Sequence, residues 1–101
     1  MTGAKSFEEH EAEHVRLTIL RLLERQPAYQ ANDSIITDSM ARYGFRVSRD
    51  RVRVQLDWLA EQDLVRLEKI ESIVIATVTG RGVDVAKGHA VATGVKRPSA
   101  V

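Results

Sequence analysis

The chain has 101 residues, of which 44% are hydrophobic and 29% are charged, a composition typical of one folded domain large enough to bury a core. The net charge is only +1, and the absence of cysteine excludes disulfides, thiolate zinc sites and thiol nucleophiles. No stretch resembles a signal peptide or is long enough to span a bilayer, so we expect a protein of the bacterial cytoplasm without a membrane partner.

Capping and terminating signals predict a first helix from about Phe7 to Arg25. Ser6 begins a capping box, and the proline after the helix ends it. The core stripe of this helix consists of Val15, Ile19, Leu22 and Leu23. Leu17 and Leu20 fall outside the stripe, and they either pack under a C-terminal helix or form a dimer contact. A loop is expected over residues 26–32.

The segment His10-Glu11-Ala12-Glu13-His14 of this helix matches the zinc-protease pattern H-E-x-x-H. Histidines four residues apart share a helix face and can hold a metal. Three features argue against catalysis: the charged Glu13 inside the motif, the lack of a supporting sheet upstream, and the lack of a third ligand at a short spacing. We therefore interpret the motif as a polar helix face and expect no enzyme activity, metal site or cofactor.

A second helix is predicted from about Ser34 to Tyr43, with Asn32 or Asp33 as its N-cap. Its inward-facing residues are expected to be Ile35, Ile36 and Met40. Gly44 supplies a left-handed residue that ends the helix, and a short turn leads to Ser48. A helix, a short turn containing glycine and another helix make a helix-turn-helix.

The segment SRDRVRVQLDWLAEQDLV predicts a third helix from Arg49 to about Gln62, capped by Ser48. Its core stripe consists of Val52, Leu56 and Leu59. Val54 and Trp58 lie on another side, where a lone tryptophan is usually packed against a neighbouring element. An extended run follows the helix at once, which is the arrangement between a recognition helix and a wing.

Runs rich in β-branched residues predict two strands, Leu64–Lys69 and Ile73–Val78, joined as a hairpin. Thr79 caps a short last helix over residues 80–87, which Gly88 ends. The fold class is therefore mainly α with a small β-hairpin, in the order α-α-α-β-β-α.

The domain organisation follows from these elements. One domain spans residues 7–88, after a flexible N-terminus at residues 1–6. The small residues that follow predict an extended or disordered basic tail at residues 89–101.

Positive charge is concentrated where helix-turn-helix proteins contact DNA. Residues 42–53 contain five arginines against one aspartate, and such a cluster neutralises phosphates. Arg49 and Arg53, four residues apart, can present guanidinium forks to guanine or phosphate. Ser48 either binds a phosphate or only caps the helix. The predicted DNA-binding residues are Arg46, Ser48, Arg49, Arg51 and Arg53.

Two features support other interpretations of this cluster. Asp50 and Asp57 place negative charge near the same surface, and the hairpin is neutral because its charged residues are Arg66, Glu68, Lys69 and Glu71. In the first alternative interpretation, the arginines form a solvated surface and pair with the acidic residues on either side of them. The second alternative is a module that docks another protein. The neutral hairpin favours it, and so do the apolar residues that lie outside the core stripes, which are Leu17, Leu20, Val54 and Trp58.

The segments VRVQLDWLAEQDLV and VTGRGVDVA resemble the helix-to-wing and wing-exit segments of the winged helix-turn-helix superfamily, notably its MarR-like and ArsR-like regulators. Asp63 stands where these proteins usually have glycine, and aspartate tolerates the left-handed conformation there. ILRLLERQPAYQANDSIIT, VSRDRVRVQLDWLAEQDLV, VTGRGVDVAKG and GVKRP resemble the small ArsR-like proteins of Mu-like transposable phages and prophages. The metal-sensing cysteines of ArsR regulators are missing, so metal-responsive regulation does not carry over.

The resemblance implies a winged-helix fold, a phage or prophage origin and two functional hypotheses. In the first, the protein binds double-stranded DNA, as a homodimer, in transcription regulation or genome packaging. In the second, it is a protein-docking module of a phage head or packaging assembly and binds a structural or packaging protein. The genes of the resembling phage proteins lie among morphogenesis and packaging genes, which keeps the second hypothesis open.

Overall fold

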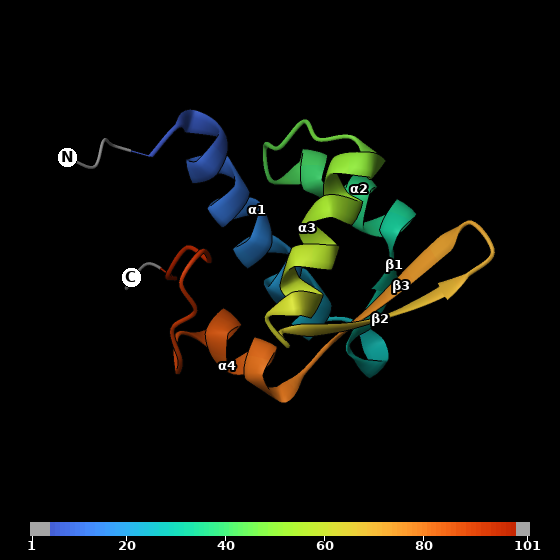
Figure 1. Ribbon diagram of the computed structural model, residues 1–101. Coiled ribbons are helices and arrows are strands. Elements are labelled where there is room, and N and C mark those ends of the chain that lie inside the picture. The colour runs from blue at the N-terminus through green and yellow to red at the C-terminus, as the bar shows by residue number, and fades with distance from the viewer. Residues whose placement is uncertain (1–4, 99–101) are drawn as a thin grey trace.

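The computed structural model describes residues 5–98 (Figure 1). The helices in this part of the chain are α1 (Phe7–Glu24), α2 (Asp33–Arg42), α3 (Arg49–Glu61) and α4 (Gly80–Lys87). A single 3-10 turn (Pro27–Tyr29) and three strands complete it: β1 (Gln30–Asn32), β2 (Val65–Ile70) and β3 (Ile73–Val78). Within residues 5–98, no helix combines the length and the apolar character that crossing a membrane requires.

Side chains cap the start of all four of these helices, because the first backbone N–H groups of a helix have no partner within it. Ser6 and Glu9 form the predicted reciprocal capping box of α1. Asn32, rather than Asp33, caps α2, and its Oδ1 accepts a hydrogen bond from the backbone N–H of Ile35 at 2.8 Å. Ser48 and Thr79 cap α3 and α4 as predicted.

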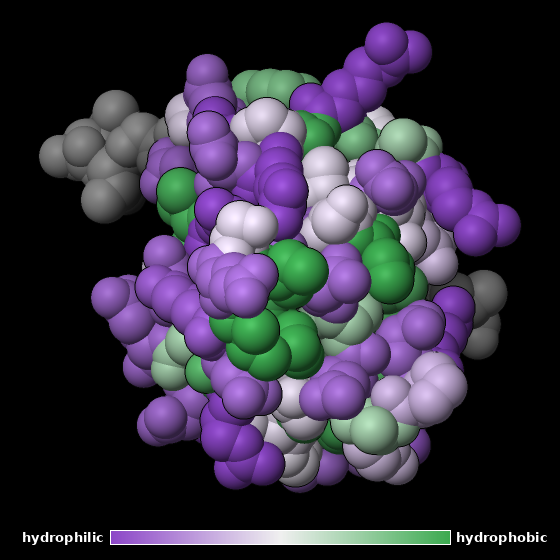
Figure 2. All heavy atoms as spheres, turned by 90° about the vertical axis from the view of Figure 1, so that its right-hand side faces the viewer, coloured by the Kyte–Doolittle hydropathy of each residue, from purple (hydrophilic) through white to green (hydrophobic). Residues whose placement is uncertain are grey.

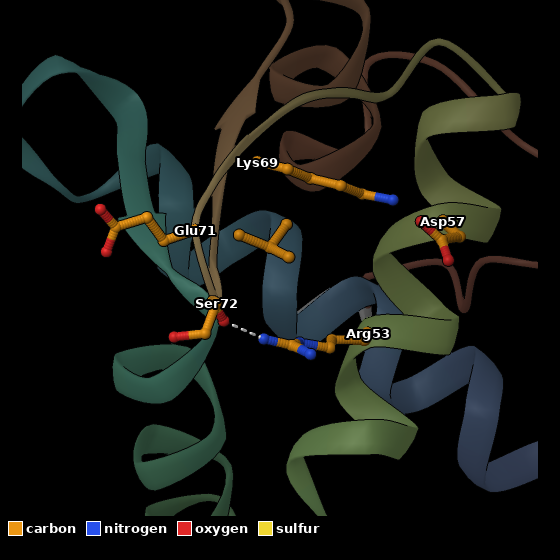
Figure 3. A pocket seen from close by; sticks show the side chains of 6 residues that line it. Arg53, Asp57, Lys69, Glu71 and Ser72 are labelled. Atoms are coloured by element: carbon orange, nitrogen blue, oxygen red, sulfur yellow. Dashed lines mark hydrogen bonds between the residues drawn. The ribbon is translucent and has the colours of Figure 1, made fainter.

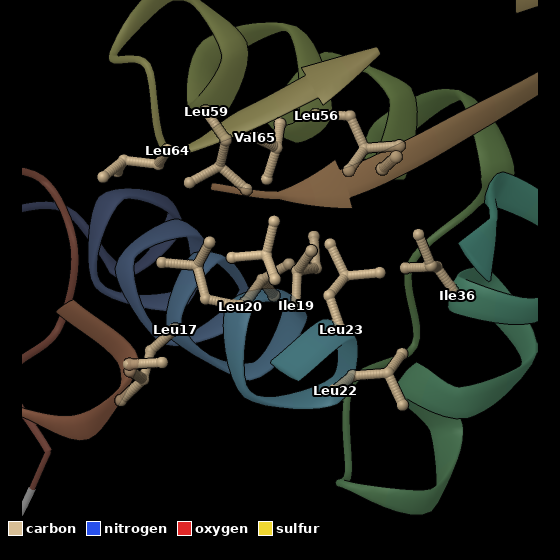
Figure 4. Packing of buried hydrophobic residues seen from close by; sticks show 14 of the residues in the cluster. Leu17, Ile19, Leu20, Leu22, Leu23, Ile36, Leu56, Leu59, Leu64 and Val65 are labelled. Carbon is tan, nitrogen blue, oxygen red and sulfur yellow. The ribbon is translucent and has the colours of Figure 1, made fainter. Parts of the chain in front are cut away.

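The core lies between α1 and the elements that surround it (Figure 4). The predicted stripes of α1 and α3 are confirmed, and Val52, Leu56 and Leu59 of α3 have no exposed surface. Leu17 and Leu20 are 5% and 0% exposed, and α4 packs against α1. Their interpretation as core residues is therefore confirmed, and their interpretation as a dimer contact is wrong.

The inward-facing side of α2 differs from the prediction at one residue. Ile36 and Met40 are fully buried, whereas Ile35 is 51% exposed. Successive helical residues point about 100° apart, so Ile36 and Met40 share the buried face and Ile35 lies outside it. In the turn after α2, Phe45 and Val47 are half-buried against the core.

Residues 26–32 are not a simple loop, because they contain the strand β1. Ala28 and Tyr29 have positive φ angles of 57° and 60°, and they turn the chain so that β1 can pair with β3. The sheet is antiparallel with the order β1-β3-β2. Three residues are too few to show the alternating pattern by which strands are recognised in a sequence.

The join between α3 and the hairpin depends on Asp63, whose φ of 60° places it in the left-handed region as predicted. Thr79 stabilises this corner because its Oγ1 donates to the carbonyl of Asp63 at 2.8 Å. The hairpin itself has a two-residue turn, Glu71 and Ser72, between paired Ile70 and Ile73.

Residues 89–98 lie against α1 and α3 and so extend the packed part of the chain beyond Gly88. Ala92 and Val95 are buried in the core cluster. The backbone N–H of Lys96 donates to the carbonyl of Glu13 in α1 at 3.2 Å. The remaining residues of the predicted tail, 99–101, lie outside the described residues, as do residues 1–4 of the predicted N-terminus.

Trp58 forms a further contact between this end segment and the helices, together with Arg16 and Gly94. The guanidinium of Arg16 lies over the indole ring, 3.9 Å from its centroid, and Arg16 Nη1 donates to the carbonyl of Gly94 at 2.8 Å. A Cβ at Gly94 would lie 2.5 Å from Cζ2 of Trp58, so only glycine permits this close approach. The prediction that Trp58 packs against a neighbouring element is confirmed.

Candidate nucleic-acid interface

The five predicted DNA-binding residues gather around the turn between α2 and α3 and the first turns of α3. Gly44, with a φ of 88°, ends α2 as predicted and directs the chain into this turn. Most of the five side chains are exposed, and Arg53 is partly buried. The helix-turn-helix therefore places all five at one end of α3, where they divide into two groups with different surroundings.

The first group, Arg49 and Arg53, binds Asp33 at the start of α2. Nε of Arg49 donates to Oδ2 of Asp33 at 3.0 Å, and Nε of Arg53 donates to the same oxygen at 2.5 Å. Both arginines also donate to the backbone carbonyl of Ser72 in the hairpin turn. Three elements distant in sequence are thus joined by one carboxylate and two guanidinium groups, which we call the Asp33 clamp (Asp33, Arg49, Arg53 and the Ser72 carbonyl).

Asp33 is an ionised group without exposed surface. Burial alone raises the pKa of its carboxyl, but the hydrogen bonds from Arg49, Arg53 and the backbone N–H of Val74 outweigh burial and hold the pKa well below its ordinary value. The side chains of Arg49 and Arg53 are 42% and 35% exposed, so part of each guanidinium still faces solvent. Sequence reasoning did not single out Asp33 as a partner of these arginines.

The second group consists of arginines that face solvent. Arg46 lies in the turn and Arg51 in the first turn of α3, and Arg42 at the end of α2 is exposed beside them in sequence. None of the three takes part in a salt bridge with another residue between positions 5 and 98. Ser48 caps α3 by accepting from the backbone N–H of Arg51 at 3.1 Å, and its hydroxyl proton stays available for donation.

The outer face of α3 becomes acidic beyond its first turn. Asp50, Val54, Asp57 and Glu61 are all exposed and follow one another at three- or four-residue spacing, so they share one side of the helix. On α3, excess positive charge is therefore confined to its N-terminal end, next to the turn that carries Arg46.

A pocket of about 170 Å³ lies between α3 and the hairpin (Figure 3). It is lined by residues of both charges: Arg53, Asp57, Lys69, Glu71, Ser72 and Val74. The side chain of Lys69 reaches from the hairpin toward α3, whereas that of Glu71 points away from it. On the face at the hairpin end, a group of apolar side chains is surrounded by hydrophilic ones (Figure 2).

His10 and His14 of the H-E-x-x-H segment are exposed on α1. Among residues 5–98, no three side chains of the metal-binding types converge on one point.

A scan of protein-family profiles finds no match for the chain. A search of known proteins finds the uncharacterized protein gp26 of Escherichia phage Mu, which is 52% identical over 83 residues. The match covers 82% of this chain and 85% of gp26.

Solved structures of other proteins resemble the chain in fold. ZitR of Lactococcus lactis matches with a TM-score of 0.60 and 24% identity, over 79% of this chain and 57% of the ZitR chain. AbsC, a MarR family transcriptional regulator from Streptomyces coelicolor, matches with a TM-score of 0.60 and 20% identity, over 78% of this chain and 58% of its own. The chain thus spans little more than half the length of each of these two proteins. It has the predicted winged-helix fold of MarR-family proteins, and by its sequence it belongs to the family of the phage Mu protein gp26.

Proposed function

We propose that this protein binds double-stranded DNA through the end of its helix-turn-helix, with Arg42, Arg46 and Arg51 as the phosphate-binding residues. One observation supports this above the others: these guanidinium groups are exposed at the N-terminal end of α3 and have no carboxylate partner between positions 5 and 98. Guanidinium groups bind phosphates strongly and release condensed counterions from DNA.

The charges along α3 favour an end-on approach to the DNA. Asp57 and Glu61 would face phosphates if the whole helix lay along the major groove, and like charges repel. The first turn carries Arg51 and the hydroxyl of Ser48, which can each reach a phosphate or a base edge. Contact is therefore limited to the turn and the beginning of α3.

Arg49 and Arg53 have a positioning role in this arrangement. The Asp33 clamp fixes α3 against α2 and the hairpin turn, so the exposed arginines are held on a rigid support. The solvent-facing part of Arg49 adds positive potential at the same end of α3.

A phage or prophage protein with this activity acts either in transcription regulation or in genome packaging. The family relationship to phage Mu gp26 and the fold shared with AbsC support a phage DNA-binding regulator. Binding that is restricted to one short operator supports the regulatory role, and equal binding to all phage DNA supports packaging.

The salt dependence of DNA binding tests the proposed contacts. For three phosphate contacts per copy, the logarithm of the binding constant falls by about 3 for each unit of log salt concentration. The double variant Arg46→Ala, Arg51→Ala lowers this slope by about 2, as measured by fluorescence anisotropy with a short labelled duplex. A control with the same charge loss, Arg21→Ala with Arg25→Ala, removes exposed arginines of α1 and its end and leaves the slope unchanged. An equal slope in all three proteins would exclude these contacts.

The outer face of α3 favours a second candidate, docking of a phage head or packaging protein. Val54 is 58% exposed between Asp50 and Asp57, a combination that suits a basic partner surface with an apolar centre. Co-purification with a terminase or head protein after nuclease treatment, lost in Val54→Glu but kept in Arg46→Ala, supports docking. Co-purification that both variants keep, or that nuclease abolishes, contradicts it.

A further inference from the structure

The pocket between α3 and the hairpin carries opposite charges on its two walls. Lys69 reaches into it from β2, and Asp57 lines it from α3 (Figure 3). Neither side chain forms a salt bridge with another residue between positions 5 and 98. Each of the two charged groups is therefore free to bind a group of opposite charge on a ligand that lies between them.

Arg53 adds a second positive charge to the pocket, and its position is fixed by the Asp33 clamp. Its Nε donates to Asp33 at 2.5 Å, and its Nη2 donates to the carbonyl of Ser72. Neither contact uses Nη1, and 35% of the side-chain surface stays exposed. Because this arginine is already held at two points, it loses little conformational freedom when it binds a further anion.

The charges that line the pocket suit a ligand that has one group of each sign. Arg53 and Lys69 are the cations, and Glu71 points away from α3, so Asp57 is the carboxylate that faces the ligand. A simple anion would gain from the cations but would be repelled by Asp57, and a simple cation would be repelled by Lys69 and Arg53. A molecule with both charges is attracted by both walls.

The size and the lining of the pocket restrict the ligand further. Its volume of about 170 Å³ is below the range of roughly 300–1,000 Å³ that is usual for drug-sized ligands, so the ligand has only a few heavy atoms. Val74 is the apolar member of the lining and is 8% exposed. A carboxylate and an ammonium group on one carbon atom, with a small aliphatic side chain, meet these requirements.

We propose that this pocket binds a small α-amino acid in its zwitterionic form. The carboxylate of the ligand lies against Lys69 and Arg53, its ammonium group lies against Asp57, and its side chain contacts Val74. The ligand bridges α3 and the hairpin and leaves the Asp33 clamp intact. The inference does not depend on the proposed binding of DNA, because none of the proposed phosphate-binding arginines lines the pocket.

Titration with three small molecules, followed by the backbone amide signals in NMR spectra, tests the site. L-Alanine carries both charges, acetate carries only the negative charge, and ethylamine carries only the positive one. L-Alanine shifts the amide signals of Asp57, Lys69 and Val74 with a dissociation constant of about 1 mM, an affinity within reach of a ligand of so few atoms. It binds at least about tenfold more tightly than acetate or ethylamine, because only L-alanine pairs with both walls.

Two variants assign the charged groups of the ligand to their partners. Lys69→Met and Asp57→Asn each weaken the binding of L-alanine about tenfold, because each removes one of the charge pairs. Lys69→Met also weakens the binding of acetate, whereas Asp57→Asn strengthens it, because a repelling carboxylate is gone. Lys87→Met and Asp84→Asn make the same chemical changes at exposed residues of α4 and leave all these affinities unchanged. Both pocket residues are exposed, and circular dichroism confirms that the variants stay folded.

Three results overturn the inference. One is the absence of shifts in the pocket amides with L-alanine, and another is equal affinity of the natural protein for L-alanine and acetate, which would indicate an unselective anion site. The third result is that acetate binds only after Asp57→Asn while L-alanine does not bind the natural protein. That pattern would show that Lys69 and Asp57 pair with each other in solution.

Discussion

Arg51 and Arg53 lie two residues apart on the same helix, yet their surroundings differ. Arg53 donates to a carboxylate without exposed surface and to the hairpin turn, whereas Arg51 extends into solvent. The difference arises from Asp33, twenty residues earlier in the chain. A cluster of like charges in a sequence can therefore contain both structural and ligand-binding members, and only the position of the opposite charge separates them.

Removing the carboxylate of the Asp33 clamp is expected to have the largest effect. In Asp33→Ala, Arg49, Arg53 and the N–H of Val74 lose their common partner. The free energy of unfolding then falls by about 3 kcal/mol, at the lower end for a broken buried ion pair because both arginines are partly exposed. Urea denaturation followed by circular dichroism measures it. Asp38→Ala, an exposed aspartate of the same helix, changes stability by less than about 0.5 kcal/mol, and an equal loss in both variants would contradict a structural role for the clamp.

Replacing Arg53, which belongs to the Asp33 clamp, and Arg51, which faces solvent, with alanine compares the two groups of arginines directly. Arg53→Ala lowers the free energy of unfolding by about 2 kcal/mol, since Asp33 keeps only Arg49 as a charged partner. Arg51→Ala changes stability by less than about 0.5 kcal/mol but weakens DNA binding, because its guanidinium is exposed. Denaturation and anisotropy on both variants give the two readouts. Comparable stability losses would mean that the two arginines have the same role.

The smallest expected effect is the loss of stability at low pH that comes from protonation of Asp33. The clamp lowers the pKa of Asp33 in the folded protein, so its contribution to stability is complete above the unfolded pKa of about 4 and is lost as the pH falls through and below that value. Between pH 6 and pH 3 the natural protein therefore loses about 1 kcal/mol more unfolding free energy than Asp33→Asn, which cannot titrate there. Denaturation curves at the two pH values measure this difference. Parallel losses would show that Asp33 titrates normally.

Local signals predicted most of the fold correctly, because they depend on neighbouring residues. The caps at Ser6, Ser48 and Thr79 satisfy N–H groups within one turn, and the buried stripes follow helical spacing. The left-handed residues Asp63 and Gly44 were likewise expected from their places at helix ends.

The features that were not predicted depend on contacts between distant residues. The spacing of Arg49 and Arg53 showed that they share one side of α3, but it could not show that the side faces Asp33. That aspartate also fits the first turn of a helix, so its sequence position carries no sign of burial. Likewise, the docking of residues 89–98 depends on the fit of Gly94 against Trp58, and small residues alone resemble a solvated tail.

Trp58 is the only tryptophan in the chain, so its fluorescence comes from a single place, the stack under Arg16 and beside Gly94. Trp58 is partly buried, so more of its indole becomes exposed to water when residues 89–98 detach, even while the helices stay folded. Its emission spectrum is thus a built-in optical reporter of whether the end segment is attached, and it needs no added label.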